Sequence, residues 1–291
     1  MKNRYTDGFD ANILKFFEKY KGLDVIYNQG VLRSVSVIRN LETIGSIHLH
    51  NFIRQLKTEK RFFCQHKFFT ILDEHFEQFF ERIDAGTLLY RARRMNEHEY
   101  DKRKDELCSC NEENFFKGFS EKDSFVPPIE KTVASRANSN GIPCLYVADS
   151  VETAISEVRP FKGTYVSVAT IEVKKPLTLF KLRVDTDDLE LSYKPFIEKY
   201  PDWYRSLRFM FSIPYENCDN NEYLVTQCIS EYVRLSGKFD GILFESSLSD
   251  KGTNYAIFNC EHEDYSQCEP ISSKIYSITN INVCFEGYNG Y

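Results

Sequence analysis

The sequence predicts an α+β fold, in which an α-helical N-terminal region precedes a mixed β core with helices. Apolar residues early in the chain recur at three- and four-residue steps, whereas beyond Gly86 short alternating segments indicate strands. These strands alternate irregularly with helices, which favours α+β over a doubly wound parallel sheet. We therefore expect a helical region over 1–83, an α+β domain over 84–270 and a C-terminal tail over 271–291.

Length and composition are those of a soluble globular protein. The 291 residues are enough for a well-buried core, and 42% are hydrophobic against 27% charged. The net charge of −6 argues against a general nucleic-acid binder. The nine cysteines show no disulfide spacing, and no apolar run is long enough for a signal peptide or a membrane span. We expect a cytoplasmic protein that binds neither membranes nor nucleic acids in general.

The N-terminal region is poor in glycine and predicts helices over 10–83. From Phe62 to Ile83, apolar residues, most of them phenylalanine, fall on one face of an amphipathic helix. We expect this helix to end near Gly86, because glycine takes backbone conformations that are costly for other residues.

Beyond Gly86 the alternating and apolar patterns predict further elements. A charged stretch over 94–122 predicts a long loop or lid. A helix is expected over 151–158, capped by Asp149-Ser150 and ended by Pro160. No pattern assigns the residues after about Pro270. The remaining expected elements are strands at 87–93, 144–148, 165–173, 241–244 and 255–258, and a helix at 220–235.

Three segments place polar residues beside predicted strands: 134–148, 149–160 and 239–258. Together with the strand at 87–93, they resemble the RES domain, a family named for Arg, Glu and Ser positions. Order and local spacing agree from residue 86 to about residue 259. The shared positions are Tyr90, Arg91, Arg136, Asn138, Gly141, Leu145, Tyr146, Ala154, Glu157, Asp240, Gly241, Ser246 and Asn254.

The sequence departs from the family pattern at three places. Ser135 stands where the family has glycine, Ala137 where an aromatic residue is common, and the 94–122 insertion is long. These departures affect the expected substrate contacts and partner more than the expected reaction.

The resemblance implies an ADP-ribosyltransferase-like fold and cleavage of the nicotinamide–ribose bond of NAD, as a toxin or defence effector. NAD is then the substrate, no cofactor is needed, and either water or inorganic phosphate as co-substrate accepts the ADP-ribose. The resemblance also implies an antitoxin or regulatory protein as partner. The sequence leaves a homo-oligomer open.

The resemblance assigns the catalytic roles to Glu157, Arg136 and Tyr146. Departure of nicotinamide leaves positive charge on the ribose, and a nearby carboxylate, Glu157, stabilises that charge in the transition state. The guanidinium fork of Arg136 suits phosphate oxygens. The ring of Tyr146 would stack on nicotinamide or hold the ribose.

The expected substrate-binding residues surround these three. On a strand, Arg91 and Arg93 would point to one face and line one cleft, with Tyr90 and Ala92 on the other face. Either Ser246 or Ser247 is the family serine, acting as a hydrogen-bond donor to substrate and not as a nucleophile, since no histidine is placed to activate it. Tyr90, Asn138 and Asn254 complete the set.

Other function classes fit the sequence less well. No metal is expected, because His48-x-His50, Cys64-x-His66 and Cys108-x-Cys110 have unsuitable spacing. Arg61 and His66 fit the short Arg-x4-His pattern of HEPN ribonucleases, which is common by chance. Two alternatives remain open: an ADP-ribosyltransferase that modifies a macromolecule, and an inactive nucleotide-binding module.

Overall fold

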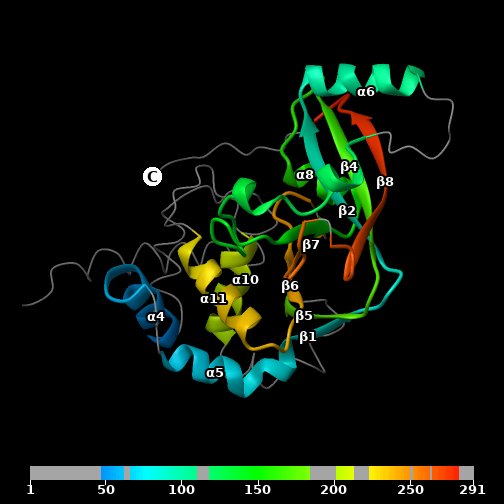
Figure 1. Ribbon diagram of the computed structural model, residues 1–291. Coiled ribbons are helices and arrows are strands. Elements are labelled where there is room, and N and C mark those ends of the chain that lie inside the picture. Colours follow the sequence, from blue (N-terminus) through cyan, green and yellow to red (C-terminus); the bar gives the residue numbers. More distant parts are fainter. Residues whose placement is uncertain are drawn as a thin grey trace, which may run out of the picture.

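The computed structural model describes residues 47–61, 66–109, 118–183, 201–212, 223–249, 252–262 and 264–281. Their centre is an eight-stranded sheet of order β1-β5-β6-β7-β3-β2-β4-β8 (Figure 1). All neighbouring strands run antiparallel except β5 and β6, which are parallel. The predicted α+β class is therefore confirmed. The strands are β1 (Phe80–Ile83), β2 (Leu88–Met95), β3 (Leu145–Ala148), β4 (Tyr165–Val173), β5 (Leu177–Leu182), β6 (Gly241–Glu245), β7 (Thr253–Ile257) and β8 (Cys268–Ser277).

The helices cover different parts of this sheet. Helices α4, α5, α10 and α11 gather on one side of it, whereas α6 lies at the end of β2, β4 and β8 (Figure 1). None of the helices in the described ranges is both long and apolar enough to cross a membrane. The helices are α4 (Ile47–Thr58), α5 (Lys67–His75), α6 (Glu97–Ser109), α7 (Glu121–Ser124), α8 (Val151–Glu157), α10 (Pro201–Ser212) and α11 (Leu224–Leu235), with 3-10 turns η1 (Phe76–Phe79) and η2 (Ile129–Lys131).

The largest hydrophobic core lies between the sheet and the helices α4, α5, α10 and α11. Phenylalanine rings fill it: Phe52 stacks on Phe68 at 4.5 Å, and Phe79 stacks on Phe180 of β5 at 4.4 Å. Burial of one such side chain contributes about 1.5–3 kcal/mol. The phenylalanine-rich segment before the sheet therefore packs in the same core as the sheet itself.

The predicted helix ending near Gly86 is wrong in its last part. Helix α5 ends at His75, the 3-10 turn η1 follows, and residues 80–83 form β1. Strand β1 pairs with β5 from Phe80 to Ile83, and Glu81 forms a 3.1 Å ion pair with Lys181. Pairing with a strand distant in sequence thus overrides the local helical period. Gly86 then takes a φ of 86° in the turn that leads to β2, as glycine can.

The predicted loop over 94–122 is also wrong in its first half. Strand β2 continues to Met95, and α6 occupies Glu97–Ser109. The helix begins with a reciprocal cap, in which Asn96 Oδ1 accepts from the Glu99 N–H at 2.8 Å and Glu99 Oε2 accepts from the Asn96 N–H at 2.9 Å. Residues 110–117 of that prediction lie outside the described residues, as do 10–46, 62–65 and 220–222 of the predicted helices.

Two strands of the sheet carried no prediction. Strand β8 occupies Cys268–Ser277, where no pattern was assignable, and pairs with β4 along its whole length. Strand β5 lies between β1 and β6. Both are stabilised by neighbours distant in the chain.

Candidate active site

The candidate site lies where two neighbouring strands part. β2 and β3 are paired at one position, Tyr90 with Ala148. Continued antiparallel pairing would bring Arg91 opposite Val147 and Ala92 opposite Tyr146, and neither pair is formed in the register. A cavity of about 440 Å³ opens between these residues. Because the strands separate there, residues of both strand faces reach it.

Most of the predicted site residues line this cavity. They are Tyr90, Arg91, Arg136, Tyr146, Glu157, Ser247 and Asn254. Asn138 and Ser246 do not line it, but each forms a hydrogen bond with a residue that does. Segments far apart in the sequence thus meet around one hollow.

Glu157 is the last residue of α8, a helix packed on β2, β3 and β4 and therefore on both sides of the parting. Ser150 starts the helix, because its Oγ accepts a hydrogen bond from the Thr153 N–H at 3.1 Å. Thr153 and Ala154 form its buried face. The carboxylate at the other end of the helix is thereby held at the cavity wall.

Two side chains donate to the same oxygen of this carboxylate. Ser246 Oγ donates to Glu157 Oε1 at 2.6 Å, and Asn254 Nδ2 donates to it at 2.7 Å. Within the described part of the chain, Oε2 has no hydrogen-bond donor of its own. Ser246 Oγ also accepts from the N–H groups of Leu248 and Ser249, both at 3.1 Å. The Ser246 proton is thus engaged with Glu157, and Ser247 is the serine that meets the cavity.

Arg136 projects from a tight turn that two side chains fix. The turn closes with a 2.9 Å hydrogen bond from the Ser135 N–H to the main-chain carbonyl oxygen of Asn138. Gln227 of α11 donates from Nε2 to the same carbonyl oxygen of Asn138 at 3.1 Å and to the main-chain carbonyl oxygen of Ser135 at 2.8 Å. The Arg136 guanidinium lies 5.4 Å from the centre of the Phe244 ring, a cation–π distance.

Tyr146 holds the other side of this turn. Its hydroxyl accepts from the Ala137 N–H and donates to Asn138 Oδ1, both at 2.8 Å. Burial raises the pKa of Tyr146, so the phenol stays protonated at neutral pH. Because the hydroxyl is used by the turn, the ring is the part of Tyr146 that remains for a ligand.

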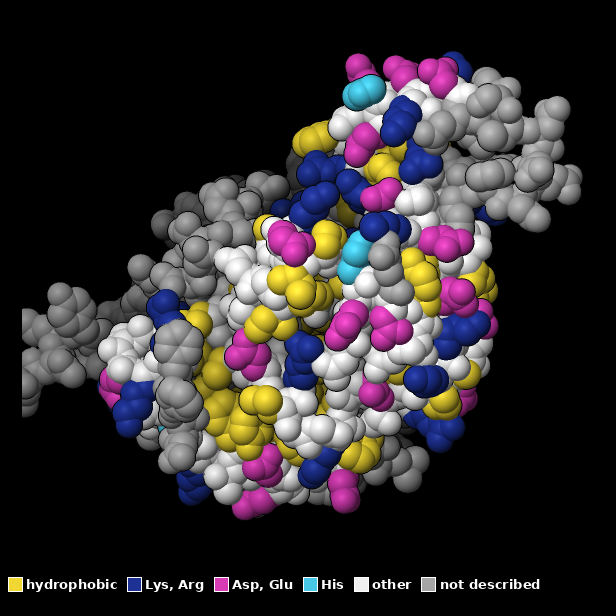
Figure 2. Space-filling view, in the orientation of Figure 1, with side chains coloured by type: hydrophobic (Ala, Val, Ile, Leu, Met, Phe, Trp, Pro, Cys, Tyr) yellow, Lys and Arg dark blue, Asp and Glu magenta, His cyan; other side chains and the backbone are white. Residues whose placement is uncertain are grey.

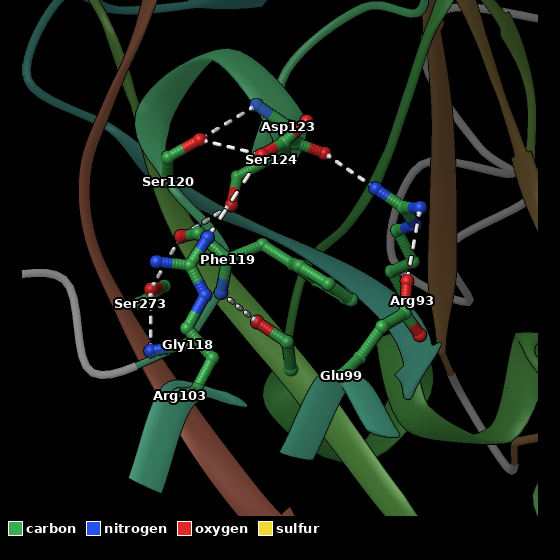
Figure 3. Close-up of polar contacts among 10 residues, drawn as sticks. Arg93, Glu99, Arg103, Gly118, Phe119, Ser120, Asp123, Ser124 and Ser273 are labelled. Carbon is green, nitrogen blue, oxygen red and sulfur yellow. Dashed lines mark hydrogen bonds and ion pairs between the residues drawn. The ribbon is translucent and has the colours of Figure 1, made fainter. Parts of the chain in front are cut away.

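Arg91 lines the cavity as predicted, but Arg93 does not. Burial, with Arg93 contributing, lowers the pKa of Arg91 to about 10, which leaves it charged at neutral pH. The Arg93 guanidinium instead lies 4.3 Å from the centre of the Phe119 ring. It donates to the main-chain carbonyl oxygen of Asp123 at 3.4 Å and forms an ion pair with Glu99 at 3.7 Å (Figure 3). The expected shared cleft is therefore wrong for Arg93, because α6 and α7 hold its side chain. Tyr90 and Ala92, expected on the other face, do reach the cavity.

The segment that binds Arg93 is itself anchored on the sheet. Gly118 and Phe119 donate their N–H groups to Ser273 Oγ and Ser167 Oγ, at 3.0 and 2.9 Å (Figure 3). A Cβ at Gly118 would lie 2.2 Å from Ser167 Oγ, so no larger residue fits without a shift. This anchor places α7 beside Arg91, whose Nη1 donates to the main-chain carbonyl oxygen of Ser124 at 3.4 Å.

Several lining residues carried no sequence prediction of a binding role. They include Ser135, Arg159, Tyr223, Phe244 and Leu248. Phe244 and Arg159 lie within the segments singled out by the sequence, but nothing in their spacing marks them. Tyr223 had no signal, since it meets the cavity only through the packing of α11.

The charge of the cavity wall is predominantly positive. Its described lining contains three arginines, Arg91, Arg136 and Arg159, and a single carboxylate, Glu157. Lys and Arg side chains gather on the same part of the surface, below α6 and over α8 and β2 (Figure 2). A chain of net charge −6 thus concentrates cations at one hollow, which suits an anionic small ligand. Among the described residues, no group of three or more His, Cys, Asp or Glu side chains could hold a metal ion.

The family model of the RES domain matches residues 114–279. The chain belongs to the RES domain family. The matched residues of the RES domain include Arg136, Glu157, Ser246 and Asn254, whereas Tyr90 and Arg91 precede the match and reach the same cavity through β2.

Two further comparisons complete the description of this RES domain protein. No curated protein matches it. Among solved structures, it is similar to a chain in the crystal structure of the M. tuberculosis MbcT–MbcA toxin–antitoxin complex, with 11% identity and a TM-score of 0.36. That match covers 72% of this chain and 91% of the other.

Proposed function

We propose that this RES domain protein cleaves NAD at the bond between nicotinamide and ribose. The observation that carries the proposal is the Glu157 carboxylate, oriented by Ser246 and Asn254 at the wall of a cavity rich in arginine. An NAD molecule has the matching features: a pyrophosphate, two ribose rings and two aromatic bases.

The proposed reaction begins with departure of nicotinamide, which takes both electrons of the glycosidic bond. The positive charge that develops on the ribose lies beside Glu157, whose carboxylate stabilises it more in the transition state than in the ground state. A water oxygen then bonds to the ribose carbon and releases one proton, giving ADP-ribose. With phosphate as acceptor, a phosphate oxygen forms that bond and the product is ADP-ribose 1-phosphate.

The remaining residues of the site suit binding or positioning and not bond making. Arg136 and Arg91 supply guanidinium groups for the pyrophosphate. The rings of Tyr90, Tyr146 and Phe244 offer apolar faces for the bases. Ser246 acts as a positioning residue, because its proton is already bonded to Glu157.

The test is mass spectrometry of NAD incubated with the pure protein, with and without phosphate at equal ionic strength. If water is the acceptor, we expect nicotinamide and ADP-ribose in both reactions. If phosphate is the acceptor, we expect nicotinamide and ADP-ribose 1-phosphate in the reaction that contains phosphate and intact NAD in the other. Transfer of labelled ADP-ribose to protein or RNA in a lysate would favour the macromolecular alternative. Intact NAD under all conditions would refute the proposal.

In the cell, NAD cleavage would remove a cofactor whose ADP-ribose products are not recycled directly. We therefore propose that the protein acts in the cytoplasm as a toxin or defence effector, restrained by an antitoxin or regulatory partner. Induced expression should stop growth and deplete NAD together. Growth arrest with normal NAD would contradict this role.

A further inference from the structure

Arg159 has an unusual backbone conformation directly after the helix that carries Glu157. Its φ is 45°, in the left-handed region. Among the described residues, only Arg159 and Asn259 combine a side chain with a positive φ. Asparagine tolerates this region, and glycine occupies it without steric cost, whereas a long side chain gains nothing from it.

Glycine would therefore be the expected residue at this helix end. The turn itself needs no arginine, since its hydrogen bonds are made by the main chain: the N–H groups of Val158 and Arg159 bond to the oxygens of Ile155 and Ser156. An unfavourable backbone conformation at the edge of a cavity indicates that the Arg159 side chain has a role in the site.

The side chain is also placed where a third cation is useful. Arg159 lines the cavity together with Arg91 and Arg136, and these three come from the end of α8, from β2 and from the turn at 135–138. Arg159 follows Glu157 by two positions, with Val158 between them, so the same helix end fixes both groups. A guanidinium there adds to the positive potential that an anionic ligand meets.

We propose that Arg159 is a substrate-binding residue that contacts a phosphate of a pyrophosphate-bearing nucleotide. The proposal rests on the proposed function and adds a third guanidinium to its binding site. The plainer explanation is that Arg159 stabilises α8 by placing a positive charge at the carboxyl end of its dipole. The two explanations differ in the Tm that they predict for Arg159→Gly: substrate binding predicts no fall in Tm, whereas stabilisation of α8 predicts a fall.

The experiment compares Arg159→Gly, Arg159→Lys and, as matched control, Asn259→Gly. Calorimetric titration with ADP-ribose measures affinity, and thermal unfolding measures stability. We expect Arg159→Gly to bind ADP-ribose about 10- to 100-fold more weakly, because a charged hydrogen bond is lost. Its Tm should equal or exceed that of the parent, because glycine takes the left-handed conformation freely. Arg159→Lys should lose less affinity.

The control should bind ADP-ribose as the parent does, since Asn259 bonds to Arg234 and does not line the cavity. Unchanged affinity of Arg159→Gly would overturn the proposal, as would a fall in Tm that accompanies the loss of affinity. A parent that does not bind ADP-ribose would overturn it too. A parent that binds ADP-ribose but leaves NAD intact would refute the cleavage reaction while Arg159 keeps its binding role.

Discussion

Replacing Glu157 with Gln tests the charge of the carboxylate apart from its contacts. A glutamine side-chain oxygen can still accept the hydrogen bonds that Ser246 and Asn254 donate to Oε1. The change therefore removes one negative charge and leaves the local packing in place. The free energy of unfolding should change by less than about 1 kcal/mol.

The expected loss of turnover follows from the position of that charge. A carboxylate about 4 Å from a cationic ribose gains about 4 kcal/mol at an effective dielectric constant of about 20. Glu157 is exposed at the cavity wall, so solvent screening reduces this gain. We expect turnover to fall by about 10²–10³-fold, which corresponds to roughly 3–4 kcal/mol of transition-state stabilisation. Affinity for NAD should change much less, because the arginines that bind its phosphates are untouched.

Turnover is measured at saturating NAD as the rate of nicotinamide release, with nicotinamide quantified by chromatography. Calorimetry with the Glu157→Gln protein measures NAD affinity. Glu152→Gln is the matched control, since Glu152 is an exposed carboxylate of the same helix that does not line the cavity. The control should keep parental turnover. Cleavage at the parental rate by Glu157→Gln would refute the role of the carboxylate, as would loss of cleavage in Glu152→Gln alone.

Three further changes test the surrounding residues. Arg136→Lys keeps the charge but loses the bidentate fork, so kcat/KM for NAD should fall about 10- to 100-fold; an unchanged kcat/KM would contradict phosphate binding by this residue. Ser246→Ala removes one of two donors to Glu157, so turnover should fall by a factor equivalent to about 1.5–3 kcal/mol at constant NAD affinity; loss of affinity without loss of turnover would make the serine a substrate ligand. Tyr146→Phe leaves the Ala137 N–H and Asn138 Oδ1, in the turn that carries Arg136, without the hydroxyl as partner. Denaturant unfolding should then show a stability loss of about 1–3 kcal/mol, and equal stability would show that the turn does not need the hydroxyl.

The strands with strong alternation, such as Tyr165–Val173, could be predicted because burial on one sheet face imposes a period of two on their own residues. β1 could not, because Phe76 and Phe79 continue a helical period into residues whose conformation is decided by β5. Helix α6 was predicted as a loop because it lacks an apolar face; the signal that was missed is the pair Asn96 and Glu99, which form a reciprocal cap at its start.

The candidate site divides in the same way. Arg136 and Glu157 could be named as candidates because the short segments that hold them resemble the RES domain. The role of Ser246 as a donor to Glu157 could not, because it depends on how the end of β6 meets the end of α8. Arg159 was equally hidden, since a positive φ leaves no pattern in the residue order.

The parting of β2 and β3 has a consequence for how the cavity can evolve. Along a strand, alternate residues direct their peptide N–H and C=O groups to the same neighbouring strand. Of Arg91 and Ala92 one therefore turns these groups toward the opening, and of Tyr146 and Val147 one does so from the opposite edge. Released from pairing with each other, these peptide groups are donors and acceptors that no substitution can delete. Under the proposed function, any contact that these groups make with the ligand would be set by the topology, and substitution of side chains around the opening would leave it in place.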